Sequence, residues 1–446
     1  MNVPFPGPPS RPSRVVTALA ALTVVSLGLS ACSPGDLGSS GDGEGITLTY
    51  LIPNGPEDVA LAEALVEGFS AANPDITVEV ETRPGGGDGD NLIKTRLATG
   101  EMTDVFLYNT GSLFQAIHPD RNLVPVTGEE WVEGLDDSFL PTVTAGEEVY
   151  GPPIGSAMGG GVLYNRTVYA ELGLDVPRTW EQFMANNAAI AEAGTAPVIQ
   201  TYGDTWTSQL FVLGDFHNVA AAEPDFAESY TANEAKYATS PAAIRGFEHL
   251  QEVAEAGYLN EDFAAATYED GLRMVAEGTG AHYPMLTNAI SPMVEAVPEA
   301  AEDVGFFALP GDDEAGNGLT MWAPSGVYIP NTTEGEQREA ALRFLAFIAS
   351  PEGCDAQTRG QTPSGPYLVA GCELPADVPT SVTDVQVYFD EGRVSPALEF
   401  LSPIKGPALE QITVEVGSGI RTAASGARLY DDDVEKQAQQ LGLEGW

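Results

Sequence analysis

The chain has 446 residues, 43% of them hydrophobic, and its 65 acidic side chains outnumber its 19 basic ones for a formal net charge of −46 at pH 7. Without the leader described below, about 400 residues remain, enough for two domains or lobes with real cores. Such a charge repels nucleic acid and anionic headgroups and disfavours anionic ligands, so nucleic-acid binding is excluded, and we attribute the acidity to solubility in a salty or exposed setting.

The N-terminus has the pattern of a secretion signal. Arg11 and Arg14 precede an uncharged stretch, residues 15–31, rich in Ala, Leu and Val, and a positive region followed by such an apolar run directs export. The run ends on Leu29-Ser30-Ala31-Cys32. This ending resembles the bacterial lipobox, which implies that Cys32 carries a lipid and becomes the mature N-terminus. A plain N-terminal membrane helix is the alternative, although about 17 residues is short for a span.

The segment after Cys32 is rich in Ser, Pro, Gly and acidic residues. Such a composition cannot bury a core and is typical of a flexible tether. We therefore expect residues 1–31 to be a lipoprotein signal peptide and residues 32–45 to be the tether that joins the lipid anchor to the folded part.

Two further cysteines, Cys354 and Cys372, lie 18 positions apart. An exported chain that keeps two cysteines is a candidate for a disulfide, and such a loop stabilises a fold by about 3 kcal/mol in the chain-entropy model. Two free thiols are the alternative, because spacing alone does not decide the geometry.

After the tether, strand and helix patterns alternate. Periods of two and of 3.6 residues distinguish them, and an unbroken apolar run indicates a strand buried on both faces. The order βαβαβ with right-handed crossovers predicts a doubly wound α/β lobe. The predicted elements are strands at 46–52, 76–80 and 105–108, a helix at 59–69, and a short helix at 92–98 that follows a Gly-rich loop at 85–89.

A second unit begins after Pro153. Its clearest helix start is a capping box, Thr179 with Gln182 three residues later. At the end of the chain, Asp431-Asp432-Asp433 precedes a predicted helix at 434–443 and is interpreted as favouring that helix's N-terminus. The remaining predicted elements are strands at 162–164, 198–199 and 304–309, and helices at 244–254, 272–276 and 335–350.

The order of these segments resembles the family 1 extracellular solute-binding proteins, which include maltose-type and other sugar receptors. One segment departs from the pattern: many relatives have an Ala-Met pair followed by a Trp near Ala281–Met285. The matching segments, which cover essentially the whole mature chain, are Leu65–Pro74 (ending Phe-x-x-x-Asn-Pro), Leu97–Phe106 (ending Gly-x-x-x-Asp-Val-Phe), Val149–Pro153, Val162–Arg166, Gly173–Phe183, Phe307–Gly311 and Ala340–Ser350.

The resemblance implies a two-lobed α/β fold of the periplasmic-binding-protein type II, with doubly wound sheets joined by hinge strands. It places residues 46–150 plus 320–365 in lobe I and residues 151–319 plus 366–446 in lobe II. It implies a monomer that closes around a ligand between its lobes and then docks on an ABC permease at the outer face of the cytoplasmic membrane.

Candidate ligand-binding residues follow from the strand ends, because ligands of open α/β sheets collect beyond the carboxyl ends of the strands. Asn54, Asn109 and Asp204 lie in the loops at such ends. Their amide and carboxylate groups suit the hydroxyls of a polyhydroxylated ligand.

Aromatic rings are the natural platforms for the flat C–H faces of sugars. Trp206 follows the predicted strand at 198–199 by a short loop, and Trp322 precedes the predicted hinge at Pro324. Tyr367 is a loop aromatic that follows Pro366. For each of the three, ordinary packing in a core or between the lobes is the alternative.

The sequence does not predict catalysis, a cofactor or a metal site. The four histidines are scattered without metal-ligand spacing, and we interpret His282 as a packing or hydrogen-bonding residue. The sequence has no H-E-x-x-H, G-x-S-x-G or P-loop pattern. We therefore expect a binding protein for a small polar ligand, a mono- or oligosaccharide. A peptide or polyamine receptor is the alternative, followed by a secreted glycoside hydrolase, because counting carboxylates does not exclude one.

Overall fold

The computed structural model describes residues 45–443 and 445–446. The expected signal peptide, Cys32 and nearly all of the expected tether lie outside the described residues. Among the residues that are described, none of the helices combines the length and the apolarity needed to cross a membrane.

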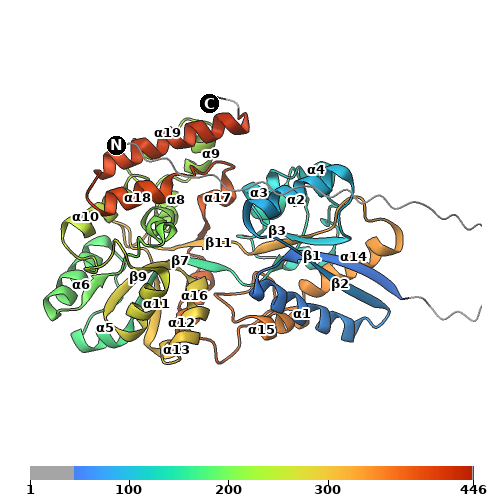
Figure 1. Ribbon diagram of the computed structural model, residues 1–446, viewed down its shortest axis with the longest axis horizontal. Helices are drawn as coiled ribbons and strands as arrows, with labels where there is room; N and C mark the ends of the chain where they lie inside the picture. Colours follow the sequence, from blue (N-terminus) through green and yellow to red (C-terminus); the bar gives the residue numbers. More distant parts are fainter. Residues whose placement is uncertain (1–44, 444) are drawn as a thin grey trace, which may run out of the picture. The chain divides into compact units, whose positions relative to one another are not determined.

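A five-stranded sheet with the strand order β2-β1-β3-β12-β6 forms the centre of the first lobe (Figure 1). Strand β1 pairs in parallel with β2 and β3, whereas β12 runs antiparallel to β3 and β6. All four residues of β3 are buried, as its unbroken apolar run predicts. The strands are β1 (Ile46–Pro53), β2 (Ile76–Arg83), β3 (Val105–Tyr108), β6 (Pro153–Ile154) and β12 (Ser325–Tyr328).

Aromatic contacts join the helices of the first lobe to this sheet. Phe69 of α1 and Tyr50 of β1 both pack against Phe344 of α14, with ring centroids 5.0 and 5.4 Å away. Fully burying a side chain such as Phe69 contributes about 1.5–3 kcal/mol. The helical elements are α1 (Pro56–Ala72), α2 (Gly86–Thr99), α3 (Ser112–Gln115), α4 (Pro119–Asn122), η1 (Glu130–Gly134), η2 (Leu140–Val143), α14 (Gly335–Ile348) and α15 (Pro351–Gly360), beside the hairpin of β4 (Thr144–Ala145) and β5 (Glu148–Val149).

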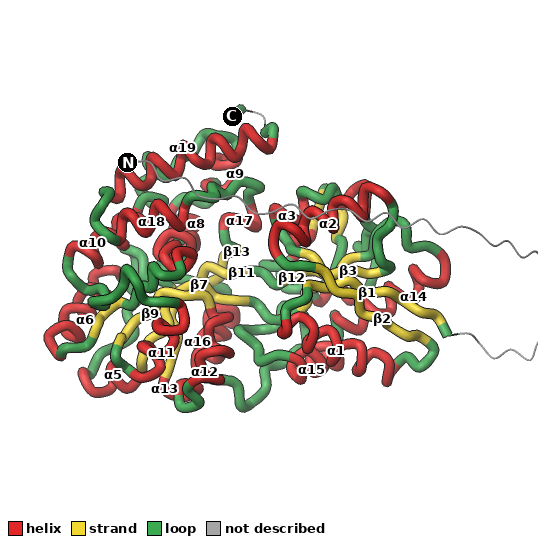
Figure 2. The backbone as a smooth tube through the Cα atoms, in the orientation of Figure 1, coloured by secondary structure: helices red, strands yellow, loops and turns green. Residues whose placement is uncertain are grey.

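A second sheet, with the order β13-β11-β7-β9-β8, forms the centre of the second lobe, and β10 pairs with β7 next to β11. Figure 2 shows the strands of the two sheets as separate groups, each surrounded by helices. The strands are β7 (Met158–Asn165), β8 (Ala196–Val198), β9 (Gly280–Leu286), β10 (Val304–Ala308), β11 (Leu319–Trp322) and β13 (Val394–Pro396).

The capping box predicted at Thr179 is confirmed at the start of α6, where the Thr179 side chain accepts from the backbone of Gln182 and the Gln182 side chain accepts from that of Thr179. The helical elements of this lobe are α5 (Arg166–Leu172), α6 (Trp180–Ala193), η3 (Thr205–Gln209), α7 (Leu210–Leu213), α8 (Phe216–Ala222), α9 (Phe226–Thr231), α10 (Arg245–Glu255), α11 (Tyr268–Glu277), η4 (Thr287–Ala289), α12 (Ile290–Ala296), α13 (Ala300–Asp303), α16 (Thr380–Asp390), α17 (Leu398–Leu401), α18 (Leu409–Gly417) and α19 (Ala423–Leu441).

Within residues 45–443, the chain passes between the two lobes three times. The first crossing, residues 155–157, joins β6 to β7, and the second, residues 323–324, joins β11 to β12. The third, residues 373–379, leads from the end of the first lobe's core, at Cys372, to α16. The two sheets put the limits between the lobes a few residues away from the expected limits at 150 and 320. Strand β6 still belongs to the first sheet, and strand β11 still belongs to the second.

Two sequence interpretations are wrong. Helix α2 begins at Gly86, inside the predicted Gly-rich loop. Helix α19 begins at Ala423, so the aspartates at 431–433 lie within it and do not mark its N-terminus. Instead, Asp431 accepts hydrogen bonds from the backbone of Tyr237 and Ala238, at 2.8 and 2.9 Å, and ties α19 to the loop before α10.

Candidate functional site

The predicted amide residues of the first lobe lie at the carboxyl ends of neighbouring strands. Asn54 follows β1 and Asn109 follows β3, and both residues are exposed. Their backbones are fixed, because Asn54 N donates to Arg83 O at 2.8 Å and Tyr328 Oη donates to Asn109 O at 3.3 Å. Within the described part of the chain neither side-chain amide has a hydrogen-bond partner, so both can bind a ligand.

A buried cation lies beneath these strand ends. Arg83, only 4% exposed, donates to the carbonyls of Pro84 and Leu107 at 3.0 and 3.4 Å. Its guanidinium carbon lies 5.9 Å from the centre of the Tyr108 ring. Burial lowers the pKa of Arg83 and raises that of Tyr108. Arg83 therefore joins the end of β2 to the end of β3, next to the residues that follow β1 and β3.

The second lobe carries an exposed aromatic pair beside a strand end. The Trp206 ring, in η3, lies 5.2 Å from that of Tyr268 at the start of α11, and Trp206 is 37% exposed. Asp204 Oδ2 accepts the backbone N–H of Tyr268 at 2.7 Å, which holds the two segments together. Burial, and then the carboxylate of Glu57 on α1, raise the pKa of Tyr268 to about 12.

A groove of about 680 Å³ at the N-terminus of α1 has walls from both lobes, and among the described residues its lining includes none of the predicted ligand-binding residues. Glu57 Oε2 accepts from Gln361 Nε2 at 3.3 Å, which links α1 to the chain after α15. Burial, and then Glu57, raise the pKa of Asp58. The groove is lined by Gly55, Pro56, Glu57, Asp58, Ala60, Thr358, Arg359, Gly360, Gln361 and Thr362 of the first lobe and by Ser291 and Glu295 of the second. Its volume suits a small organic molecule.

The other two predicted aromatic residues lie against the hinge with their polar atoms occupied. Trp322 is 7% exposed and donates its indole N–H to Glu399. Its ring lies so close to Gly160 that a Cβ there would come within 2.2 Å of it. Tyr367 is 9% exposed, and its hydroxyl is 2.7 Å from Thr358 Oγ1. The structure thus brings Asp204 and Trp206 together and places Trp322 and Tyr367 in packing between chain segments.

Sequence reasoning missed several residues of this region, chiefly Glu57, Tyr268, Glu295 and Gln361. A signal existed for one of them, since Thr267-x-x-Asp270 has a capping-box pattern that places Tyr268 first in a helix, and both hydrogen bonds of that box are present. Glu57 and Gln361 meet only when the first lobe folds, and Glu295 joins them only when the two lobes are assembled.

The buried histidine in β9 is a structural residue. His282 is fully buried, with its ring nitrogens 2.7 Å from Tyr169 Oη and 2.9 Å from Asn187 Oδ1. Burial lowers its pKa to about 3, so the ring is neutral. Among the described residues, no group of three or more His, Cys, Asp and Glu side chains could hold a metal ion.

Comparison with known proteins identifies the family. The profile of the bacterial extracellular solute-binding proteins matches residues 53–353. The chain belongs to this family. The family's proteins bind solutes and are not enzymes, as the sequence predicts.

Relatives and solved structures agree with this assignment. A "Multiple sugar-binding protein" from Streptococcus mutans is 24% identical over 346 residues, which cover 76% of this chain and 79% of the relative. The solved structure of a "Chitin oligosaccharide binding protein" has a TM-score of 0.69 and 21% identity, and covers 89% of this chain and 100% of its own. That of RafE in complex with raffinose has a TM-score of 0.68 and 18% identity, covering 87% and 100%. These structures confirm the predicted two-lobed α/β fold of this solute-binding protein.

Proposed function

We propose that this solute-binding protein captures a neutral mono- or oligosaccharide and delivers it to an ABC permease. The observation that carries the proposal is the exposed Trp206 ring, which packs on Tyr268 next to the strand-end residue Asp204. Sugar C–H faces pack on such rings, and the free amides of Asn54 and Asn109 suit sugar hydroxyls. The names of two similar proteins, a multiple sugar-binding protein and a chitin oligosaccharide binding protein, support the same ligand class.

The proposed mechanism is reversible capture without chemistry. A ligand binds one lobe while the protein is open, and the other lobe closes over it. Ligand shifts this equilibrium only by its differential affinity for the two states. The acidic groove, with Glu57, Asp58 and Glu295 against Arg359, disfavours anionic sugars.

Isothermal titration calorimetry of residues 33–446 against a panel of neutral mono- and oligosaccharides tests the proposal. We expect one sugar class to bind saturably and Trp206→Ala to weaken it about tenfold, because an aromatic contact contributes about 1.5 kcal/mol. Trp446→Ala is the matched control, since Trp446 packs on Tyr230 and Lys236 near the C-terminus. An unchanged affinity in Trp206→Ala would remove Trp206 from the site.

A second candidate is a binding protein for a cationic or zwitterionic non-sugar solute. The carboxylates of the groove favour it, and an "Osmoprotective compounds-binding protein" from Synechocystis is 23% identical over 189 residues, which cover 41% of this chain and 42% of the relative. Peptides and polyamines therefore belong in the same panel. Binding of one of these, with no sugar bound, would replace the sugar assignment by this one.

We also propose that the mature protein is anchored by lipid at Cys32, on the basis of the lipobox-like Leu29-Ser30-Ala31-Cys32. Expression of the full chain and of Cys32→Ser, followed by membrane fractionation and mass spectrometry of the N-terminal peptide, tests this. We expect diacylglyceryl mass on Cys32 and release of the variant from the membrane. An unmodified, uncleaved N-terminus in the full chain would indicate a plain membrane helix instead.

A further inference from the structure

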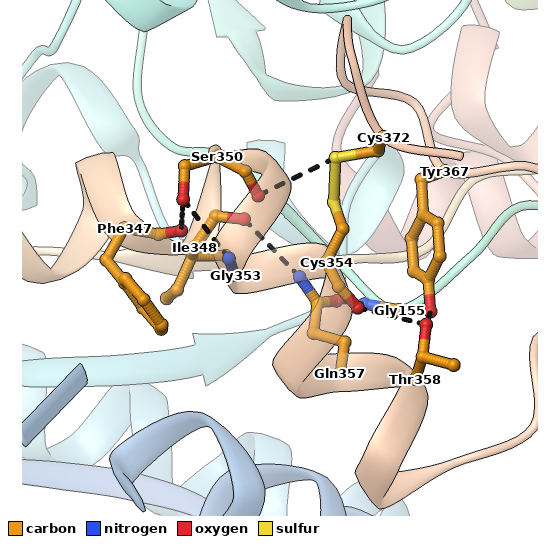
Figure 3. The surroundings of a disulfide bond; sticks show 10 residues. All are labelled: Gly155, Phe347, Ile348, Ser350, Gly353, Cys354, Gln357, Thr358, Tyr367 and Cys372. Atoms are coloured by element: carbon orange, nitrogen blue, oxygen red, sulfur yellow. Dashed lines mark hydrogen bonds between the residues drawn. A yellow bond between two sulfur atoms is a disulfide. The ribbon is translucent and has the colours of Figure 1, made fainter. Parts of the chain in front are cut away.

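Helix α15 of the first lobe is attached next to two of the three crossings. It contacts the start of the first crossing, and it also contacts the last residue before the third crossing. Cys354, in its first turns, forms a disulfide with Cys372, the last residue before the third crossing, with an S–S distance of 2.02 Å. Three residues after Cys354, Gln357 Oε1 accepts the backbone N–H of Gly155, the first residue of the first crossing, at 2.6 Å. Figure 3 shows both contacts on the same helix.

Both attachments are rigid. Cys354 and Gln357 are each 2% exposed, and Gln357 Nε2 donates to Ile348 O at 3.3 Å, which fixes the amide that holds Gly155. Gly155 itself has φ +87°, a conformation that favours glycine, so this point of the crossing is a sharp bend.

The strip of chain that ends at Cys372 is also bound to the first crossing. Ala157 N donates to Pro366 O and Ser364 N donates to Ser156 Oγ, each at 2.8 Å. Between the end of α15 and the start of α16 the connection spans residues 361–379. Asp136 N donates to Leu368 O at 3.1 Å and Ala370 N donates to Gly134 O at 2.7 Å, so this strip is held to the first lobe, and the disulfide adds a covalent attachment at its end, Cys372. Shortening a connection in this way restricts the positions that its ends can reach.

We propose that the Cys354–Cys372 disulfide and Gln357 form a hinge clamp that sets the ligand affinity by limiting how far the lobes open. The inference rests on the proposed function, in which closure of the lobes traps the ligand. A hinge consists of a few residues at the ends of helices or strands that absorb the change in backbone angles. Here the first and the third crossing are two such stretches, and both are attached to α15. Removing the disulfide or the Gln357 side chain lets the open protein adopt more conformations, and it affects the closed protein less. Closure of the lobes then costs more conformational entropy, so the affinity for the ligand falls.

Amide hydrogen exchange without ligand tests the clamp directly. Three proteins are compared: the wild type, the double variant Cys354→Ala/Cys372→Ala, and Gln357→Ala, which keeps the disulfide. We expect faster exchange at residues 155–157 and 373–379 in both variants while α6 in the second lobe is unchanged. Gln439→Ala, an exposed position on α19, is the control and should match the wild type. Gln357→Ala keeps the test decisive if the double variant does not fold.

Calorimetry with the sugar identified by the panel supplies the functional readout. We expect Kd to rise about fivefold in each variant, the size of a modest coupling between sites, and dithiothreitol to reproduce the effect on the wild type but not on the double variant. A disulfide that serves stability alone would lower the unfolding midpoint and leave Kd unchanged, which would overturn the clamp. Unchanged exchange at the two crossings would overturn it as well. If no sugar binds the wild type, the proposed function fails, and the ligand-free exchange result decides the clamp by itself.

Discussion

At the scale of single residues, Asp215 has a carboxyl group in a buried environment that disfavours its charged form. It is 2% exposed and lies on a cavity of about 330 Å³ whose lining comes from the second lobe alone. Among the described residues its side chain has one hydrogen-bond partner, Asn218 Nδ2, at 2.7 Å, whereas the nearby Arg245 pairs with Glu248, Glu252 and Asp312. Burial therefore raises the pKa of Asp215 to about 8.

This shift has a definite sign for stability. The ordinary pKa of 3.8 applies to the unfolded chain, so between pH 4 and 8 the folded state holds the proton more firmly, and Asp215 favours folding less and less as pH rises. We expect Asp215→Asn to raise the free energy of unfolding at pH 8 by about 1 kcal/mol or more and to change it little at pH 4. Urea unfolding at both pH values measures this. Asp313→Asn, an exposed residue on the same cavity, is the control, and equal pH slopes for Asp215→Asn and wild type would contradict the account.

Candidate residues of the site could be selected from the sequence where a single short loop contains them. Asp204 and Trp206 were selected as candidates because they follow a strand end within one loop, and Asn54 and Asn109 were selected for the same reason; their contact with a ligand stays a prediction. Glu57 and Glu295 were not, because their meeting depends on how the two lobes are joined, which no local pattern expresses. Trp322 was chosen for its residue type, but its environment depends on Glu399, 77 positions away along the chain.

At the scale of elements, the start of α11 positions Tyr268. The Thr267 side chain accepts from Asp270 N, and Asp270 Oδ2 accepts from Thr267 N at 3.0 Å. We expect Thr267→Ala to lower the free energy of unfolding by about 1 kcal/mol, the usual effect of losing an N-cap, and Thr267→Ser to retain most of it. Guanidinium unfolding with both variants checks this, and equal losses in the two would show that the hydroxyl is not the cause.

Element types were predicted better than their limits. Periodicity identified β1, β2, β3 and α14, since each combines a clear repeat with a defined break. Periodicity failed at α19, because the first turns of this helix have no clear apolar repeat. The three aspartates were therefore interpreted as the start of the helix. Their hydrogen bonds to distant backbone groups are tertiary contacts that override the local pattern.

At the scale of the whole molecule, the net charge of −46 must act against the compact state through self-repulsion. Salt screens exposed charges, with a Debye length of about 10 Å at 0.1 M and about 3 Å at 1 M. We expect the unfolding midpoint to rise steadily between 0.05 and 1 M NaCl, and equally in KCl. Differential scanning calorimetry measures it. A midpoint that falls with salt would mean that the ion pairs of this surface outweigh its repulsion.

The three crossings have a consequence for the order in which the molecule can fold as it is synthesised. The first sheet needs β12, at residues 325–328, and the second needs β13, at residues 394–396, so each lobe contains strands from the last third of the chain. Neither sheet can be completed while those residues are still in the ribosome. The nascent chain therefore has no finished sheet in the first lobe until residues 325–328 have left the ribosome, and none in the second until residues 394–396 have left it.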